Sequence, residues 1–319
     1  MSGRRASKPI LVTGATGTTG REVVRALLGR GAPVRVLIRS REKVENLSRS
    51  VEPAIGDLED GPSVARALDG VSAAFFVPPH DEAEAEFTRI FVDACERTGV
   101  RLVFSGVHTD GPTRLIRWVR RGLNGLLFPH YSDKMRLSEH VRMSPTRPVL
   151  LLPGNFYQND ELSRDHLLNG RFPLPFKAFP RVDAQDVGDA AANALLDSSV
   201  KSGVYWLVGQ ASMKGEEIAA NWGAALMREV RYMPDLNVSK QIFDRCLPPK
   251  KAHDYLKTQE LIARFPLPIK AADRLKGETL LGRPPRPHAD YARETAERWR
   301  AEGLMARNDC RAPELREIP

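Results

Sequence analysis

The chain has few cysteines and no long apolar run. Cys95, Cys246 and Cys310 lie far apart and form no Cys-x-x-Cys pair, so the sequence indicates reduced thiols rather than a disulfide framework. No stretch approaches the roughly 18 apolar residues that span a bilayer, and the polar N-terminus lacks the apolar core of a signal peptide. The histidines have no metal-ligand spacing. We therefore expect a cytoplasmic protein without a membrane span, a disulfide or a metal site.

The composition is typical of a globular protein, with 42% hydrophobic and 28% charged residues among 319. This length suffices for one large domain or two ordinary ones. The 48 basic residues exceed the 40 acidic ones and give a net charge of +8. This excess favours anionic ligands, but it is too diffuse to indicate nucleic-acid binding.

The most informative segment begins with a short apolar run, residues 9–13, that is typical of a strand. Gly14, Gly17 and Gly20 follow, and after them apolar residues recur at helical spacing. Glycines let the turn close tightly and let a pyrophosphate approach main-chain N–H groups, while the helix offers its N-terminal donors and positive dipole end. Strand, glycine turn and helix in this order predict a dinucleotide site. The residues assigned to it here are Gly14, Thr16, Gly17, Thr18, Thr19 and Gly20.

A second strand is expected at residues 34–38, and Arg39, Ser40 and Lys43 follow it. In dinucleotide folds this position meets the adenosine ribose, where an acidic residue binds the 2′-hydroxyl of NAD and a basic one accommodates the 2′-phosphate of NADP. The basic side chains therefore predict NADP(H), preferred over NAD(H). A solvated basic loop without a ligand is the alternative interpretation.

Further strands are expected at residues 52–55, 73–77, 101–104 and 148–152, and helical patterns lie between the early ones. Strand, turn and helix alternate regularly, which predicts an α/β fold with a doubly wound, Rossmann-like parallel sheet. Ligands of such sheets bind at the carboxyl ends of the strands.

Residues that directly follow these strands are candidate cofactor contacts. Asp57 either meets the adenine or caps the next helix. Asn155 either hydrogen-bonds the cofactor or substrate, or stabilises a turn. His80 and His108 also follow strands, but a histidine there is more often part of a surface loop. The contacts assigned beyond the second strand are Asp57, Leu58, Pro78, Ser105, Pro153, Asn155 and Phe156.

The second half of the chain is less regular. A strand is expected at residues 204–208 and helices at 215–228 and 291–300, whereas residues 245–286 show no clear period. Asp183 and Asp186 suggest paired carboxylates, but Asp186 is better interpreted as the N-cap of a small-residue helix.

We expect two parts. Residues 1–155 would form the NADP-binding domain, its sheet completed by later strands. Residues 156–319 would form a smaller α/β subdomain for a substrate or a partner, interleaved with the first.

Together these residues resemble the NmrA-like family, a branch of the atypical short-chain dehydrogenase/reductases, over roughly residues 8–300. The family implies a Rossmann-like domain with a small C-terminal subdomain and bound NADP(H). Its members are either NAD(P)H-dependent reductases or NADP(H)-binding regulators. The matching pieces are Thr13–Gly20, Arg39, Gly56–Leu58, residues 93–103, His130, Lys134, Glu139, Pro153, Phe156, Asn159, Asp183, Asp186 and residues 279–285, which contain a Gly-Arg-Pro-Pro motif.

The chain departs from ordinary short-chain dehydrogenases, which use a Tyr-x-x-x-Lys pair. Tyr131 stands only three residues before Lys134, whereas His130 has the four-residue separation that places side chains on one helix face. By resemblance, Lys134 sits beside the nicotinamide ribose, and Tyr131 or His130 could protonate a substrate oxygen. The alternatives are a Lys134 paired with Glu139 or exposed to water, and rings that only pack at a helix start.

The segment 112–128 is apolar and basic; between Pro112 and Arg142 seven basic residues face two acidic ones. Such a segment could be a lid over a hydrophobic or anionic substrate, a partner contact or, least favoured, a membrane contact. It could also be a helix with a solvated basic face.

Two functions fit these observations. The favoured one is an NADPH-dependent oxidoreductase that reduces a small apolar or aromatic carbonyl, enone or quinone, with Lys134, Tyr131 and His130 as catalytic candidates. The alternative is a redox sensor that binds NADP(H) without turnover and regulates a protein partner. The missing Tyr-x-x-x-Lys pair favours the sensor, and the basic segment with the long C-terminal part favours the enzyme.

Overall fold

The computed structural model describes residues 8–40, 50–79, 81–106 and 129–304, and of residues 129–133 only the backbone. Its centre is a seven-stranded parallel sheet in the order β10-β6-β5-β4-β1-β2-β3. The chain therefore starts in the middle of the sheet, builds one half outward and returns to build the other, which confirms the expected doubly wound fold. The strands are β1 (Ile10–Val12), β2 (Val34–Ile38), β3 (Val51–Ile55), β4 (Ala73–Phe76), β5 (Arg101–Ser105), β6 (Val149–Pro153) and β10 (Gly203–Leu207).

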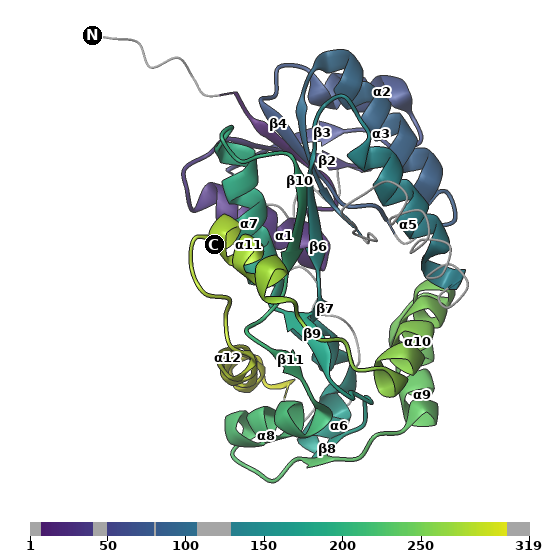
Figure 1. Cartoon of the computed structure of the whole chain (residues 1–319), viewed down its shortest axis with the longest axis vertical. Helices are drawn as coiled ribbons and strands as arrows, with labels where there is room; N and C mark the ends of the chain where they lie inside the picture. The colour runs from purple at the N-terminus through teal and green to yellow at the C-terminus, as the bar shows by residue number, and fades with distance from the viewer. Residues whose placement is uncertain (1–7, 41–49, 80, 107–128, 305–319) are drawn as a thin grey trace.

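Helices cover both faces of this sheet (Figure 1). The helices form two groups, one on each face. Since neighbouring residues of a strand face opposite sides of the sheet, Phe75 packs into the core beneath the first group and Phe76 packs into the core beneath the second. The first group closes tightly at Gly188, where a Cβ atom would lie 2.5 Å from the backbone of Glu22. The first group is α1 (Thr18–Leu28), α7 (Ala184–Leu196) and α11 (Ala271–Leu281), and the second is α2 (Gly61–Leu68), α3 (Glu84–Thr98) and α5 (Pro129–Arg142).

Two helix caps differ from the expected ones. The N-cap of α2 is Asp60, which accepts a hydrogen bond from the amide of Ser63, so the interpretation of Asp57 as the cap is wrong. The N-cap of α7 is Asp183 rather than Asp186. In both cases an aspartate three positions away occupies the capping position, because the helix begins at a slightly different residue from the one that its apolar pattern indicates.

The C-terminal part lies beyond the carboxyl edge of the sheet (Figure 1). It contains a three-stranded sheet in the order β11-β9-β7, a short β8–β12 pair and a helical core. Trp222 and Trp299 stack in this core with ring centres 5.1 Å apart. The elements are β7 (Asn155–Phe156), η2 (Tyr157–Ser163), α6 (Arg164–Leu168), β8 (Arg171–Phe172), β9 (Phe179–Val182), β11 (Ser212–Met213), α8 (Gly215–Leu226), β12 (Arg231–Tyr232), α9 (Leu236–Cys246), α10 (Pro249–Arg264) and α12 (His288–Ala301).

The region without a clear sequence period, residues 245–286, is largely helical. The helix α10 buries only a narrow stripe, Ala252, Gln259 and Ile262, and this stripe contains a polar residue. A stripe of this kind gives little hydrophobic periodicity, which explains why the sequence did not indicate a helix. Pro249 is the first residue of α10, a position where proline suits a helix start.

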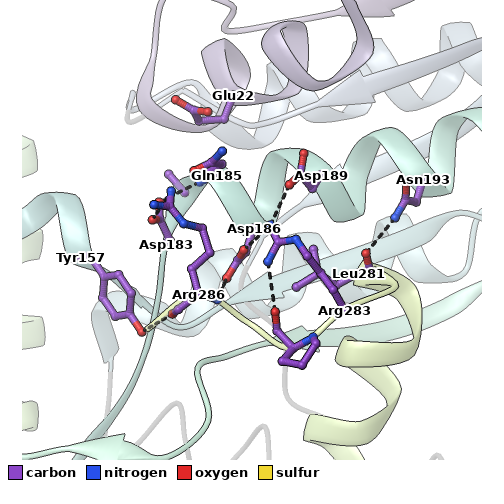
Figure 2. A network of polar contacts seen from close by, with 12 residues as sticks. Glu22, Tyr157, Asp183, Gln185, Asp186, Asp189, Asn193, Leu281, Arg283 and Arg286 are labelled. Atoms are coloured by element: carbon purple, nitrogen blue, oxygen red, sulfur yellow. Dashed lines mark hydrogen bonds and ion pairs between the residues drawn. The ribbon is translucent and has the colours of Figure 1, made fainter. Parts of the chain in front are cut away.

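The Gly-Arg-Pro-Pro segment is bound by the acidic start of α7 (Figure 2). Arg283 pairs with Asp186 and Asp189, each at 2.8 Å, and Arg286 pairs with Asp183 at 3.1 Å. The amide of Arg286 also donates to Asp186. Burial raises the pKa of Asp186, against the opposing effects of the Arg286 amide and the Arg283 guanidinium. The carboxylates considered as a pair from the sequence thus bind arginines of the same chain and fasten the segment that leads into α12.

Candidate cofactor and substrate site

A cavity of about 810 Å³ lies between the carboxyl edge of the sheet and the C-terminal part. It brings together nearly all the residues predicted to contact a cofactor, although they come from seven separate stretches of the chain. Ser40 is not among its lining residues, and Lys43 lies outside the described residues. The predicted contacts that line it are Gly14, Thr16, Gly17, Thr18, Thr19, Gly20, Arg39, Asp57, Leu58, Pro78, Ser105, Lys134, Pro153, Asn155 and Phe156.

The glycine turn has the geometry that a phosphate cradle needs. Gly14 has a φ of +62°, a conformation that side-chain-bearing residues rarely adopt, and its carbonyl accepts the amide of Gly17 at 2.8 Å. A Cβ atom on Gly20 would lie 2.1 Å from the Gly14 carbonyl oxygen. Gly17 occupies the N-cap of α1, so no side chain caps the first-turn amides. Those amides are thus free of a capping side chain at a wall of the cavity, which suits an anion.

Arg39 and Asp57 line the cavity where β2 and β3 end. Arg39 is exposed, and its guanidinium makes no ion pair or hydrogen bond with another residue that the structure describes. Asp57 accepts the amide of Glu59 at 3.2 Å and keeps its place in the lining. A contact of Asp57 with adenine and of Arg39 with a phosphate therefore remain predictions that this placement allows.

Lys134 reaches the cavity from α5 and forms an ion pair there. Its Nζ donates to Oε2 of Glu84, the first residue of α3, at 2.8 Å, and the two side chains are 17% and 13% exposed. The alternative partner from the sequence, Glu139, pairs instead with Arg142 at 2.7 Å. Glu84 also lines the cavity, and no sequence motif marks it, because it lies 50 positions from Lys134.

His130 and Tyr131 belong to the first turn of α5. Their side chains lie outside the described part of the structure. Their roles as proton donors stay predictions.

A buried arginine fixes the position of two residues that line the cavity. Arg181 is fully buried; its Nη2 donates to the Phe156 carbonyl at 2.9 Å and its Nε to Oδ1 of Asn155 at 3.3 Å. The same guanidinium binds both carboxylate oxygens of Asp160, at 2.7 and 3.1 Å. Asn155 and Phe156 therefore take their positions in β7 from a residue that does not line the cavity itself.

Asp160 is the centre of this buried polar group. It also accepts hydrogen bonds from Trp222 at 3.0 Å and from His288 at 2.9 Å. Burial alone would raise the pKa of Asp160, but the Arg181 guanidinium and the His288 hydrogen bond lower it to about 2. Burial lowers the pKa of His288. At neutral pH the network is an ionised aspartate between a charged arginine and a neutral histidine.

The helices α9 and α10 supply a wall that the sequence did not indicate. Tyr255 packs edge-to-face on Phe243, with ring centres 5.8 Å apart, and its hydroxyl donates to Asn159 at 3.4 Å. No motif marks these positions, because they lie in the region without a clear period. The lining residues from this wall are Phe243, Lys251, Asp254, Tyr255, Thr258, Gln259 and Leu261.

Comparison with known sequences decides the family. The model of the NmrA-like family matches residues 6–270, most of the chain. This chain belongs to the NmrA-like family. The resemblance expected from its motifs is thereby confirmed.

Two reductases and a transcriptional regulator are among the proteins that the chain is similar to. The chain is 31% identical over 232 residues to an NAD(P)H azoreductase of Xenophilus azovorans, which covers 70% of this chain and 76% of the relative. It is also similar to the structure of a Citrobacter sp. triphenylmethane reductase complexed with NADP(H), with a TM-score of 0.73, 20% identity and coverage of 90% and 99% of the two chains. The structure of Nmra, a negative transcriptional regulator, gives a TM-score of 0.72, 20% identity and coverage of 93% and 98%. At these identities the two structures establish the shared fold.

None of the helices in the described ranges is long and apolar enough to cross a membrane. The segment 112–128 lies outside these ranges. Its role as a lid, a partner contact or a membrane contact stays a prediction.

Proposed function

We propose that this NmrA-like protein is an NADPH-dependent reductase of a small aromatic or conjugated acceptor, such as a quinone, an enone or an azo compound. The observation that carries this proposal is the extent of the cavity, which is lined both by the glycine turn of β1–α1 and by the aromatic wall of α9–α10. A site for a dinucleotide alone would not require the second wall. Its volume of about 810 Å³ is at the upper end of what ligand pockets usually have.

The residues that line the cavity around the glycine turn fit NADPH. The uncapped amides at the start of α1 suit its diphosphate, and the close approach of Gly20 to Gly14 leaves room only for a glycine there. Arg39 would bind the 2′-phosphate. By family resemblance Lys134 would lie at the nicotinamide ribose, near Ser105 and Asn155. When bound, NADPH supplies a hydride from its nicotinamide.

The protein's own contribution is to position the acceptor and to manage a proton. The aromatic wall orients a flat acceptor and excludes water from it. Lys134 lines the cavity and is held in place by Glu84. It would stabilise negative charge that develops on the acceptor, and Tyr131 or His130 would assist protonation. Activated acceptors need little more than this.

The azoreductase relative supports the reductase assignment, because it matches this chain over most of both lengths. The triphenylmethane reductase shows that the same fold accommodates NADP(H). Neither identifies the acceptor of this chain.

The test follows NADPH absorbance with a panel of quinones, enones and azo dyes. We expect turnover of at least one class and a fall of about 10- to 100-fold in kcat for Lys134→Ala. Arg142→Gln is the control, since Arg142 also forms an ion pair in α5 but does not line the cavity. Equal activity of Lys134→Ala and wild type would remove Lys134 from the mechanism.

A second candidate is an NADP(H)-binding sensor. The observation that favours it is the Lys134–Glu84 ion pair, which already satisfies the charge of the candidate catalytic lysine. Tight NADPH binding without oxidation of NADPH by any member of the panel would support the sensor and overturn the reductase.

A further inference from the structure

Lys251 is a basic residue in the cavity wall, and the described part of the chain offers it no carboxylate partner. It lies in the first turn of α10, is half-buried and lines the cavity. Its Nζ lies 5.5 Å from the centre of the Tyr255 ring. Among the residues that the structure describes, no carboxylate forms an ion pair with it. Burial lowers the pKa of Lys251, so its surroundings disfavour the unpaired charge.

The fold does not need a cation at this position. A positive charge in the first turn of a helix opposes the helix dipole, so Lys251 does not stabilise α10 electrostatically. The neighbouring Lys250 already fastens α10 to the segment after β4, because its Nζ donates to the Asp81 carbonyl at 2.8 Å. The structural work of this turn is therefore done by a different lysine.

The other charges that line this region are engaged elsewhere. Lys134 forms an ion pair with Glu84. Asp81 accepts the amide of Ala83 at 2.9 Å. Asp254, one turn along α10, makes contacts of its own and does not pair with Lys251. An anionic group that entered the cavity beside Tyr255 would lie near Lys251, whose Nζ is 5.5 Å from the centre of that ring.

We infer that Lys251 binds an acidic substituent, a sulfonate or carboxylate, of an aromatic acceptor whose ring lies against Tyr255 and Phe243. The inference rests on the proposed reductase function and narrows its substrate class to anionic aromatic compounds. A flat ring suits the edge-to-face pair of aromatic side chains, and the ammonium supplies a charge-assisted contact at its edge. The net charge of +8 would attract such a ligand from solution.

A binding experiment tests this independently of turnover. Anilinonaphthalene sulfonate and its uncharged counterpart, phenylnaphthylamine, are titrated against the protein with and without saturating NADP⁺, and their fluorescence is recorded. Lys251→Gln should bind the sulfonate about tenfold more weakly and the neutral probe unchanged. Lys251→Arg should retain both affinities. Lys257→Gln is the matched control, since Lys257 lies in α10, pairs with Glu260 and does not line the cavity.

Equal binding of the sulfonate by wild type and Lys251→Gln would overturn the inference. An equal loss for both probes would also overturn it, because it would mean that Lys251 only packs on Tyr255.

A turnover experiment then connects the contact to substrate choice. With naphthoquinone sulfonate as acceptor, Lys251→Gln should raise KM about tenfold at unchanged kcat, and with unsubstituted naphthoquinone it should change neither. Equal effects on the two quinones would contradict the assignment. If the wild type reduces neither these quinones nor any other member of the panel, the proposed function fails, whereas the binding result still decides whether Lys251 holds an anion.

Discussion

At the scale of single residues, the site is organised by which charges already have a partner inside the protein. Lys134 and Arg181 are bound by carboxylates, and each thereby has a fixed position. Arg39 and Lys251 line the same cavity and have no carboxylate partner among the described residues. The paired cations are therefore held in place, and the proposed contacts with anionic parts of ligands fall to Arg39 and Lys251.

Arg39 provides the sharpest test of cofactor choice. Arg39→Glu should weaken NADPH binding about 10- to 100-fold while it leaves NADH binding within a few-fold, because only NADPH has a 2′-phosphate. The measurement is a fluorescence or calorimetric titration with both cofactors. Arg66→Glu, an exposed site on α2 outside the cavity, controls for the change of net charge. An equal loss for both cofactors would show that Arg39 does not recognise the phosphate.

Asp160 should make the stability of the protein depend on acid pH. Its folded pKa of about 2 lies below its usual value of 3.8, so its stabilisation is complete above about pH 4 and is lost as the pH falls towards 2. This contribution is on the order of 2 kcal/mol. Urea unfolding at several pH values measures it. Asp160→Asn should lose about 3–5 kcal/mol at pH 7, since it leaves Arg181 buried without a counter-charge, and its stability should vary less over this range. A wild-type slope retained in the variant would assign the acid sensitivity to other carboxylates.

At the scale of elements, the β1–α1 unit depends on one close contact. Gly20→Ala would place a methyl group 2.1 Å from the Gly14 carbonyl, so the turn must open. We expect a loss of about 1–3 kcal/mol in the free energy of unfolding. The free energy of NADPH binding should weaken by more than this amount. Thermal unfolding and titration measure the two. Gly61→Ala is the control, because its added methyl group would meet nothing closer than 3.7 Å. Unchanged NADPH affinity in Gly20→Ala would mean that the diphosphate does not use this turn.

The elements that could be predicted from the sequence are those specified by local patterns. The apolar run at residues 9–13, the glycines after it and the helical spacing that follows indicate a strand, a turn and a helix without reference to the rest of the chain. The helix caps were missed by three residues, because aspartates at both positions can cap and only the packing of α2 and α7 decides between them. The ion pair of Lys134 with Glu84 could not be predicted, because it joins two helices that meet only after the sheet has formed.

The aromatic wall could not be predicted for a related reason. The helix α10 buries so few apolar residues that its pattern is weak, and the side chains that line the cavity are partly polar. A helix of this kind lacks the hydrophobic periodicity on which such predictions depend. The part of the site that the whole fold shares was therefore visible in the sequence, and the part that would select a substrate was not.

At the scale of the whole molecule, the two parts of the chain share one sheet. β10 and α7 both follow residue 155. Nevertheless β10 pairs with β6 along five residues, and α7 packs on α1 through Gly188. The core under α1 includes Val187 and Leu195, each of which contributes about 1.5–3 kcal/mol when buried. The expected boundary near residue 155 thus lies between the glycine turn and the α9–α10 wall in sequence, while the two parts of the chain share one sheet and one core.

This arrangement predicts how fragments of the chain behave. Residues 1–155 alone should show no cooperative thermal transition and no NADPH binding, because removal of α7 and β10 exposes the core beneath α1. The lost burial energy exceeds the net free energy of unfolding of a typical domain, roughly 5–15 kcal/mol. The fragment 1–210 contains both elements and should recover a cooperative transition. Its transition temperature should lie below that of the full chain, since the fragment still lacks α11. Circular dichroism and NADPH titration measure the two fragments. If residues 1–155 unfolded cooperatively and bound NADPH like the full chain, the first part would be an independent domain, and the packing of α7 on α1 would be dispensable.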